Sequence, residues 1–460
     1  MTGIKFKISN VRLQIALCAA LAVGCVPTHA QSKRARQSPQ KSSKESAGRD
    51  GAAQASEVAE LLARAVGLLQ AGKRDEAEPL VRRVLSADPR NASAHSLLGI
   101  ILDQRGLLRE AEAEYRATIA LSPKSAAAHS NLGGLLAREG RYAEAVEALR
   151  AALANAPGHP QATYNLGVAL YHVGLYEEAA ALLQTPEAVS QDAPGAFYYL
   201  GLAASARGRA EEAAEFWQRA LALRENFPEV NFALGEELRK QRRYEGAAEF
   251  YSKAVAQDVS KPVYQVRLGG VLMLLSSYDR ALEVFRGAAS RFPESAEIQY
   301  FVGIAARGRG DYEAAEAALR ESLRLKKDSV DALAQLGFVL GERGRDAEAE
   351  TTLRRALALD ARHFYASYDL GRLLVRGRRY DEALKVLDGA ARIRERDAGV
   401  HYQLFIAYTR TGRKADAERE LQLFKRLDEE RKSRRAAGGE EQIEDTLTKA
   451  REVEGNPERR

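Results

Sequence analysis

Cysteine is almost absent from this sequence of 460 residues. Both cysteines, Cys18 and Cys25, lie within residues 1–30. From residue 31 onward the chain therefore offers no disulfide, no thiol nucleophile and no cysteine ligand for a metal. Its stability must come from packing alone.

Proline and glycine are also few, at 13 and 36 residues, which excludes a collagen-like chain and a disordered chain rich in these two residues. With 45% hydrophobic and 29% charged residues, the composition is that of a packed protein. The net charge of +6 arises in residues 1–54, and residues 55–460 are close to neutral. We therefore predict no nucleic-acid partner.

The sequence lacks the motifs of common enzymes. None of the seven histidines falls in an H-x-x-x-H or H-E-x-x-H pattern, and no P-loop, GxSxG or dinucleotide-binding glycine motif occurs. His95 and His129 occupy equivalent positions of an internal repeat, which explains them better than a metal site does. The prediction is a protein without catalytic activity, cofactor or metal.

Residues 1–30 have the pattern of a secretory signal peptide. A basic start precedes the apolar stretch 13–23, and small residues up to Ala30 suit cleavage before Gln31. The apolar stretch is shorter than the roughly 20 residues that a transmembrane helix needs. The sequence predicts export to the periplasm or the extracellular space, with cleavage after Ala30.

A second processing signal lies at Cys25. Residues 21–25 resemble the bacterial lipobox, although Ala22 stands where leucine is usual. Cys25 is therefore a candidate lipidation site, and its acylation would tether the protein to the outer membrane as its one membrane contact. A soluble exported protein and a tethered one are both open from the sequence.

Residues 31–56 are rich in Gln, Ser, Lys and Arg and almost free of large apolar side chains. Such a segment cannot bury enough apolar surface to offset its ordering entropy, so we predict a disordered basic linker. The alternative is a basic patch that touches anionic lipid or cell-wall polymer.

A regular period of roughly 34 residues dominates the rest of the chain. Nine glycines stand at this spacing: Gly99, Gly133, Gly167, Gly201, Gly235, Gly269, Gly303, Gly337 and Gly371. Eleven alanines stand twelve residues after the glycine position: Ala77, Ala111, Ala145, Ala179, Ala213, Ala247, Ala281, Ala315, Ala349, Ala383 and Ala417. Four residues after each alanine comes a large apolar residue, as in Tyr115, Trp217 and Phe285.

Each repeat has two stretches of helical apolar spacing separated by a short turn. The glycine of the first helix and the alanine of the second let two backbones approach closely, where a larger side chain would cost roughly 1–3 kcal/mol. We expect the large apolar residue to fill the gap toward the next repeat.

The period and its small-small-aromatic pattern resemble the tetratricopeptide (TPR) repeat of exported bacterial proteins, although the family's tryptophan early in the first helix is missing. The resemblance covers residues 58–431 and implies an all-α fold, a right-handed α-solenoid superhelix of about eleven helix-turn-helix repeats. The repeats are expected to start near Val58, Ala92, Ala126, Pro160, Pro194, Pro228, Pro262, Ala296, Val330, Phe364 and Ala398. Residues 432–460 are expected to form the end of a capping helix and a disordered charged tail.

One repeat departs from the pattern at Pro186, where other repeats have alanine. Proline inside a helix costs about 3 kcal/mol. We therefore expect the second helix of this repeat to end near Thr185 and residues 187–194 to form a loop.

The resemblance also implies a concave groove, lined by the first helices, that binds a partner polypeptide. Two sets of candidates stand three and two residues before the repeat-glycine position, which is Phe405 in the last repeat. They are Tyr164, Tyr198, Phe232, Tyr300, Tyr368 and Tyr402, and Asn131 and Asn165. Aromatic rings with a polar edge suit peptide contact, and the alternative role is packing between neighbouring first helices. Basic candidates that suit an acidic partner are Arg239, Arg267, Arg307 and Arg372.

The sequence thus predicts a non-enzymatic, exported scaffold for protein–protein interaction, which we expect to be a monomer. A carboxylate clamp for chaperone tails is not expected, because Ser96 and Ser130 stand where the family's clamp needs lysine. The alternative function is that of an outer-membrane lipoprotein that assists assembly of a pilus or a polysaccharide export machine.

Overall fold

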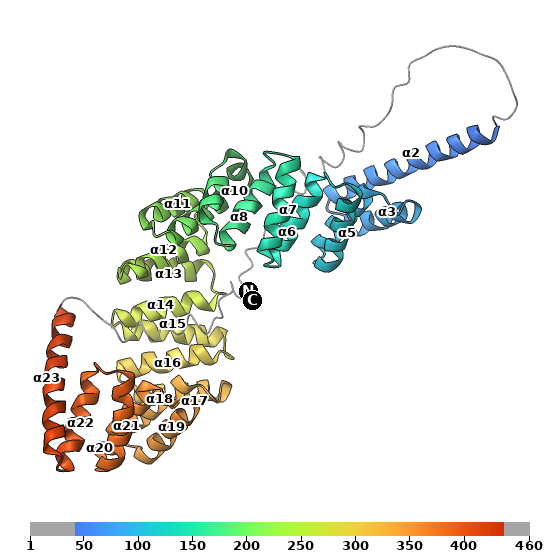
Figure 1. The fold of residues 1–460 in the computed structure, drawn as a ribbon. Helices are drawn as coiled ribbons and strands as arrows, with labels where there is room; N and C mark the ends of the chain where they lie inside the picture. The colour runs from blue at the N-terminus through green and yellow to red at the C-terminus, as the bar shows by residue number, and fades with distance from the viewer. Residues whose placement is uncertain (1–41, 437–460) are drawn as a thin grey trace. The chain divides into compact units, whose positions relative to one another are not determined.

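The structure is a computed structural model and describes residues 42–436. All regular elements in this range are α-helices. They form two compact units, of which unit 1 ends at Glu225 and unit 2 begins at Asn226 (Figure 1). None of the described helices combines the length and the apolar character that crossing a membrane requires.

Unit 1 contains these helices: α2 (Ser42–Gln70), α3 (Arg74–Ala87), α4 (Ala92–Gln104), α5 (Leu108–Leu121), α6 (Ala126–Arg138), α7 (Tyr142–Asn155), α8 (Pro160–His172), α9 (Tyr176–Leu183), α10 (Pro186–Ala206) and α11 (Ala210–Leu223). Unit 2 contains these: α12 (Pro228–Lys240), α13 (Tyr244–Gln257), α14 (Pro262–Leu274), α15 (Tyr278–Arg291), α16 (Ala296–Arg309), α17 (Tyr312–Leu325), α18 (Val330–Glu342), α19 (Asp346–Leu359), α20 (Phe364–Arg376), α21 (Tyr380–Ile393), α22 (Ala398–Arg410) and α23 (Lys414–Ala436).

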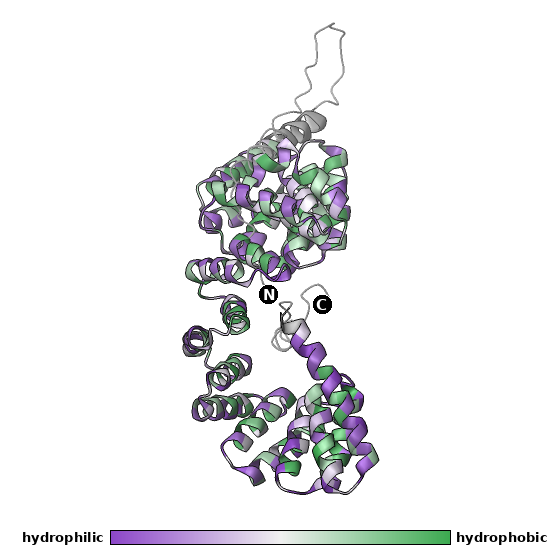
Figure 2. Cartoon of the chain, turned by 90° about the vertical axis from the view of Figure 1, so that its left-hand side faces the viewer, coloured by the Kyte–Doolittle hydropathy of each residue, from purple (hydrophilic) through white to green (hydrophobic). Residues whose placement is uncertain are grey.

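The helices pack in pairs, an even-numbered first helix against the odd-numbered second helix that follows it. Within each unit, every second helix also contacts the first helix of the next pair. In Figure 2 the helices of both units carry hydrophobic and hydrophilic residues on the same helix, as expected where one face is buried. The predicted all-α helical-repeat fold is confirmed.

The repeat glycines are the points of closest approach within a pair. A Cβ atom on Gly201 would lie 2.3 Å from Nε1 of Trp217, and one on Gly133 would lie 2.5 Å from Cγ of Leu149. All nine glycines face the side chain sixteen residues later in this way. The large apolar residue therefore packs over the glycine of its own repeat, which corrects our expectation that it fills the gap toward the next one. All eleven repeat alanines are buried.

The turn inside each pair places one residue in the left-handed region of backbone conformation. In unit 1 this residue is always glycine, for example Gly140 with φ 78° and Gly174 with φ 84°. In unit 2 three repeats have other residues there, namely Arg242, Ser276 and Arg378, with φ values of 59°, 55° and 60°. Residues other than glycine adopt this conformation at a cost, so unit 2 stores strain that unit 1 avoids.

The segment around Pro186 differs from our expectation. Helix α9 ends at Leu183, close to the predicted end, but residues 187–194 belong to α10 and do not form a loop. Thr185 caps α10 and Pro186 is its first residue, a favourable way to start a helix. The helix kinks at Asp192 (φ −156°, ψ 86°), whose carboxylate accepts a hydrogen bond of 3.2 Å from the Gly195 amide and so caps the second half.

The ends of the array also differ in part from the prediction. Residues 42–56 of the expected linker belong to the long helix α2, where Ala52, Ala53 and Ala55 favour helix. Helix α23 ends the described chain and carries the expected helical end at residues 432–436. The expected signal peptide, residues 31–41 and residues 437–460 lie outside the described residues.

Candidate partner-binding surface

The candidate groove residues all lie on first helices, in two sets. Unit 1 holds Asn131, Tyr164, Asn165 and Tyr198. Unit 2 holds Phe232, Arg239, Arg267, Tyr300, Arg307, Tyr368, Arg372 and Tyr402. Asn131, Asn165 and Arg267 are buried, Tyr402 is exposed, and the others are half-buried.

In unit 1, Tyr164 packs between α8 and the kink of α10. A Cβ atom on Gly195 would lie 2.4 Å from the Tyr164 hydroxyl oxygen, which also bonds to Asp192. Arg224 donates a hydrogen bond of 3.0 Å to the same carboxylate. Burial and the Asp192 carboxylate raise the pKa of Tyr164 well above its ordinary value. This ring joins helices within unit 1, which favours the packing role over the contact role.

A larger aromatic cluster in unit 1 was missed by sequence reasoning. His172 stacks on Tyr142 at a centroid distance of 4.0 Å and meets Tyr199 edge-on at 5.9 Å. Tyr199 also meets Tyr171 at 5.6 Å and Tyr198 at 5.2 Å. Burial lowers the pKa of His172 to about 4, so the cluster is neutral at physiological pH. The repeat register could have identified this cluster, because Tyr171 and His172 stand four and five residues after the repeat glycine Gly167.

In unit 2, the first helices α12 and α14 hold an ionic network. Glu236 accepts hydrogen bonds from Tyr251 (2.6 Å), Arg267 (3.0 Å) and Arg239 (3.1 Å). Burial alone would raise the pKa of Glu236, but Arg239 and Arg267 hold this pKa below its ordinary value. Two guanidinium groups thus share one carboxylate.

Farther along unit 2, two guanidinium groups contact the ring of Phe338 on α18. Arg307 of α16 and Arg372 of α20 each lie 5.1 Å from the ring centroid, within reach of a cation–π interaction. Arg307 donates to Gln335 at 2.7 Å, and Arg372 donates to Glu342 at 2.6 Å. The repeat therefore brings Arg307 and Arg372, two of the predicted basic residues, to one place.

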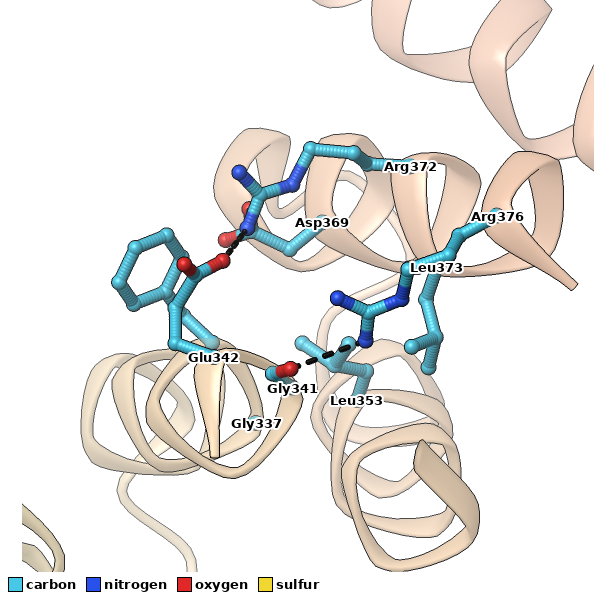
Figure 3. Close-up of a pocket in the computed structure, with 9 residues that line it drawn as sticks. Gly337, Gly341, Glu342, Leu353, Asp369, Arg372, Leu373 and Arg376 are labelled. Carbon is cyan, nitrogen blue, oxygen red and sulfur yellow. Dashed lines mark hydrogen bonds and ion pairs between the residues drawn. The ribbon is translucent and has the colours of Figure 1, made fainter. Parts of the chain in front are cut away.

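Beside Phe338 lies a pocket of about 220 Å³ (Figure 3). The apolar floor is formed by Gly337, Phe338, Gly341, Leu353 and Leu373. The charged rim is formed by Glu342, Asp369, Arg372 and Arg376. The pocket exists because Gly341 stands four residues after the repeat glycine, where neighbouring repeats have Met273, Arg307 and Val375. Arg376 donates to the Gly341 carbonyl at 2.9 Å.

Asp369 is the one rim group without a close ionic partner in the described part of the chain. Its carboxylate is 3.9 Å from Arg372, and its side chain is 11% exposed. Burial raises the pKa of Asp369 to about 7, although Arg372 and Arg307 oppose this rise. The sequence analysis did not select Asp369, because an aspartate two residues before a repeat glycine carries no motif.

The remaining aromatic candidates of unit 2 contact other rings. Phe232 lies 4.9 Å from Tyr264, and Tyr368 lies parallel to Phe364 at 6.1 Å. Burial raises the pKa of Tyr300 above its ordinary value. Tyr402 is 42% exposed and meets Phe424 at 5.1 Å. Of the aromatic stripe, Tyr402 is thus the ring most available to a partner.

Two histidines form ion pairs at the same repeat position. His95 in unit 1 contacts Glu114, and His401 in unit 2 contacts Glu420 at 2.7 Å. The second ring nitrogen of each meets a backbone carbonyl, which favours the doubly protonated ring. Burial lowers the pKa of each histidine, but the hydrogen bonds to glutamate and to the backbone carbonyl, together with the nearby carboxylate charges, outweigh burial and raise the pKa above its ordinary value.

Fold and surface together define an all-α helical-repeat protein whose first helices present aromatic and ionic side chains. Family models agree with the period. The model of the tetratricopeptide repeat matches residues 62–126, 102–160 and 131–196, and a second such model matches 194–219. The C-terminal domain of cilia and flagella-associated protein 70 matches 220–444. The chain is a tetratricopeptide-repeat protein.

Solved structures of similar fold include Cut9 with Hcn1 from the APC/C, at 13% identity and a TM-score of 0.43, covering 85% of this chain and 96% of that chain. A tetratricopeptide repeat protein from Parabacteroides merdae has 16% identity and a TM-score of 0.43, and the match covers 54% of this chain and 99% of that chain. Yeast Tom70 has 14% identity and a TM-score of 0.37, and the match covers 78% of this chain and 96% of that chain. The comparison with curated proteins gave no match.

Proposed function

We propose that this protein is an exported, non-enzymatic scaffold that binds a partner polypeptide along its first helices. The observation that carries the proposal is the pocket at Gly341. It has the size of one side chain, an apolar floor and a charged rim that includes Arg372, one of the predicted groove residues. Buried anchor pockets with polar rims are where protein interfaces concentrate their binding energy.

The test is photo-cross-linking in the native envelope with a photoreactive amino acid in place of Tyr402, the exposed ring of the last repeat. We expect a cross-linked polypeptide that is lost when the pocket is filled by Gly341→Leu. A Cβ atom on Gly341 meets no atom closer than 3.6 Å, so the substitution fills the pocket without a backbone clash.

The matched control is Gly389→Leu. Gly389 also lies in a helix of unit 2, and a Cβ atom there has no neighbour within 4 Å. The control should leave the cross-link unchanged. Loss of the cross-link in both variants, or in neither, would contradict a role for the pocket.

Export and the membrane tether are proposals that rest on residues 1–30 of the sequence. The mass of the mature N-terminus separates the two alternatives. A chain that begins at Gln31 supports the soluble scaffold in the periplasm or outside the cell. An acylated Cys25 supports the outer-membrane assembly factor for a pilus or polysaccharide exporter, and an intact Met1 contradicts both.

A further inference from the structure

The ionic network on α12 and α14 carries more positive charge than it can neutralise internally. Arg239 and Arg267 share the single carboxylate of Glu236. The Arg267 side chain is 7% exposed and the Arg239 side chain 15%. A buried charge without a partner is costly, because the protein interior does not solvate it as water does.

The network also has more hydrogen-bond donors than acceptors. The Nε–H group of Arg239 is buried and has no hydrogen-bond partner among the described residues. Arg267 uses only its Nε–H group in a hydrogen bond to the described chain, which leaves its two terminal nitrogens. Buried polar groups are almost always satisfied, so an unsatisfied donor beside an excess positive charge indicates a missing anionic acceptor.

Arg307, on the next first helix α16, repeats this imbalance. Within residues 55–433 no carboxylate lies within 4.0 Å of its guanidinium group, which is held only by the neutral Gln335 and the Phe338 ring. Arg239 and Arg307 both stand four residues after a repeat glycine, two repeats apart. Arg267 stands on the first helix between them.

We propose that the partner segment that binds along α12, α14 and α16 is an acidic peptide, whose carboxylates accept hydrogen bonds from Arg239 with Arg267 and from Arg307. The proposal rests on the proposed function and specifies the partner's charge. Both the Arg239–Arg267 pair and Arg307 offer a preorganised guanidinium group. Such a group suits a carboxylate because its planar fork donates two parallel hydrogen bonds.

The experiment measures binding of labelled peptides to the full chain by fluorescence anisotropy at low ionic strength. The three peptides have one alternating pattern, with serine between glutamate, glutamine or lysine. We expect the glutamate peptide alone to bind, and we expect Arg239→Gln and Arg307→Gln each to weaken this binding about tenfold. Binding by all three peptides alike would overturn the proposal.

The matched control is Arg324→Gln, which removes the same charge from a second helix of unit 2. Arg324 is 63% exposed and already pairs with Glu321. We expect its effect to be less than about twofold, since exposed charges are well screened. An effect as large as that of Arg307→Gln would show unspecific attraction and overturn the proposal.

Two further measurements keep the result decisive. Arg239→Gln removes one partner of Glu236 and could unfold unit 2, so circular dichroism accompanies every variant. If Arg239→Gln unfolds the unit, Arg307→Gln decides alone, because it breaks no ion pair among the described residues. Inorganic phosphate is compared with chloride at equal ionic strength. If phosphate displaces the glutamate peptide as effectively as the unlabelled peptide does, the site binds small oxyanions and the proposal falls.

The cross-linking experiment at Tyr402 detects any bound polypeptide, whatever its charge. A cross-linked partner whose bound segment is neutral or basic would leave the proposed scaffold function intact and remove the acidic-peptide inference. The two proposals therefore fail separately.

Discussion

Unit 1 and unit 2 share one repeat but present different chemistry at the same position of their first helices. Four residues after the repeat glycine, Tyr171 of unit 1 lies in a neutral aromatic cluster. At the same position in unit 2, Arg239 pairs with Glu236, and Arg307 contacts Gln335 and the ring of Phe338. The repeat glycines and alanines are the same in both units. The packing positions thus fix the fold, and the first-helix surface is free to differ between units.

The largest expected effect tests whether the packing is the same in both units. Gly201→Ala in unit 1 and Gly269→Ala in unit 2 each place a Cβ atom 2.3 Å from a buried ring, that of Trp217 or Phe285. We expect each substitution to lower the free energy of unfolding by about 1–3 kcal/mol, because the rigid rings cannot move aside. Urea unfolding followed by circular dichroism measures the loss.

The control for this pair is Gly389→Ala in α21, where a Cβ atom has no neighbour within 4 Å. Alanine there should raise the free energy of unfolding by about 0.5–1 kcal/mol, since it favours helix more than glycine does. If Gly269→Ala behaved like the control, the two units would not share one packing rule.

Opposite pH dependence is the next prediction, because the two units bury different titratable groups. Burial lowers the pKa of His172 in unit 1 to about 4, so unit 1 loses stability as pH falls from about 6.5 toward 4. Burial raises the pKa of Asp369 in unit 2 to about 7, so unit 2 loses stability as pH rises from about 4 toward 7.

The measurement uses the single tryptophan of the chain, Trp217, whose fluorescence reports unit 1, while circular dichroism reports both units. We expect Asp369→Asn to raise the free energy of unfolding at pH 8 by about 1–2 kcal/mol and to have little effect near pH 4. His172→Gln should remove the acid sensitivity of the tryptophan signal. If tryptophan fluorescence and circular dichroism gave the same pH profile of unfolding, the two units would not differ in pH dependence.

The histidine–glutamate pairs sharpen the comparison, since they are a feature that both units have. The pKa of His95 and of His401 is raised, so the stability each pair contributes is complete below about pH 6.5 and is lost as pH rises through the raised value. Glu114→Gln and Glu420→Gln should each cost about 1 kcal/mol near pH 6 and less at pH 8. A cost that does not change with pH would contradict a charged pair.

Sequence reasoning reached the fold because the repeat constrains it at many positions. Each glycine must accept a large side chain of the second helix, so the regular spacing of these residues predicts the helix pairs and their contacts. It failed at residues 187–194, where the strong helix start at Thr185 and Pro186 outweighed the expectation of a loop.

The binding surface could be predicted only in part. Register identified Arg307 and Arg372 as surface residues, but it did not reveal that both contact Phe338. It also gave Tyr164 and Tyr402 equal weight, although the first packs against α10 and the second is exposed. Contacts between neighbouring first helices decide exposure, and these depend on residues one full repeat apart whose sizes no motif constrains.

The smallest expected effect concerns the turns inside the helix pairs. Arg378 in unit 2 has φ 60°, and Gly140 has φ 78° at the equivalent turn of unit 1. A residue other than glycine in this conformation costs about 1 kcal/mol. Arg378→Gly should therefore stabilise unit 2 by about 0.5–1 kcal/mol, and Gly140→Ala should destabilise unit 1 by a similar amount. Thermal unfolding of both variants checks the pair. Changes of the same sign would mean that backbone strain at this turn does not distinguish the units, and that the arginine side chain contributes more to unit 2 than its conformation costs.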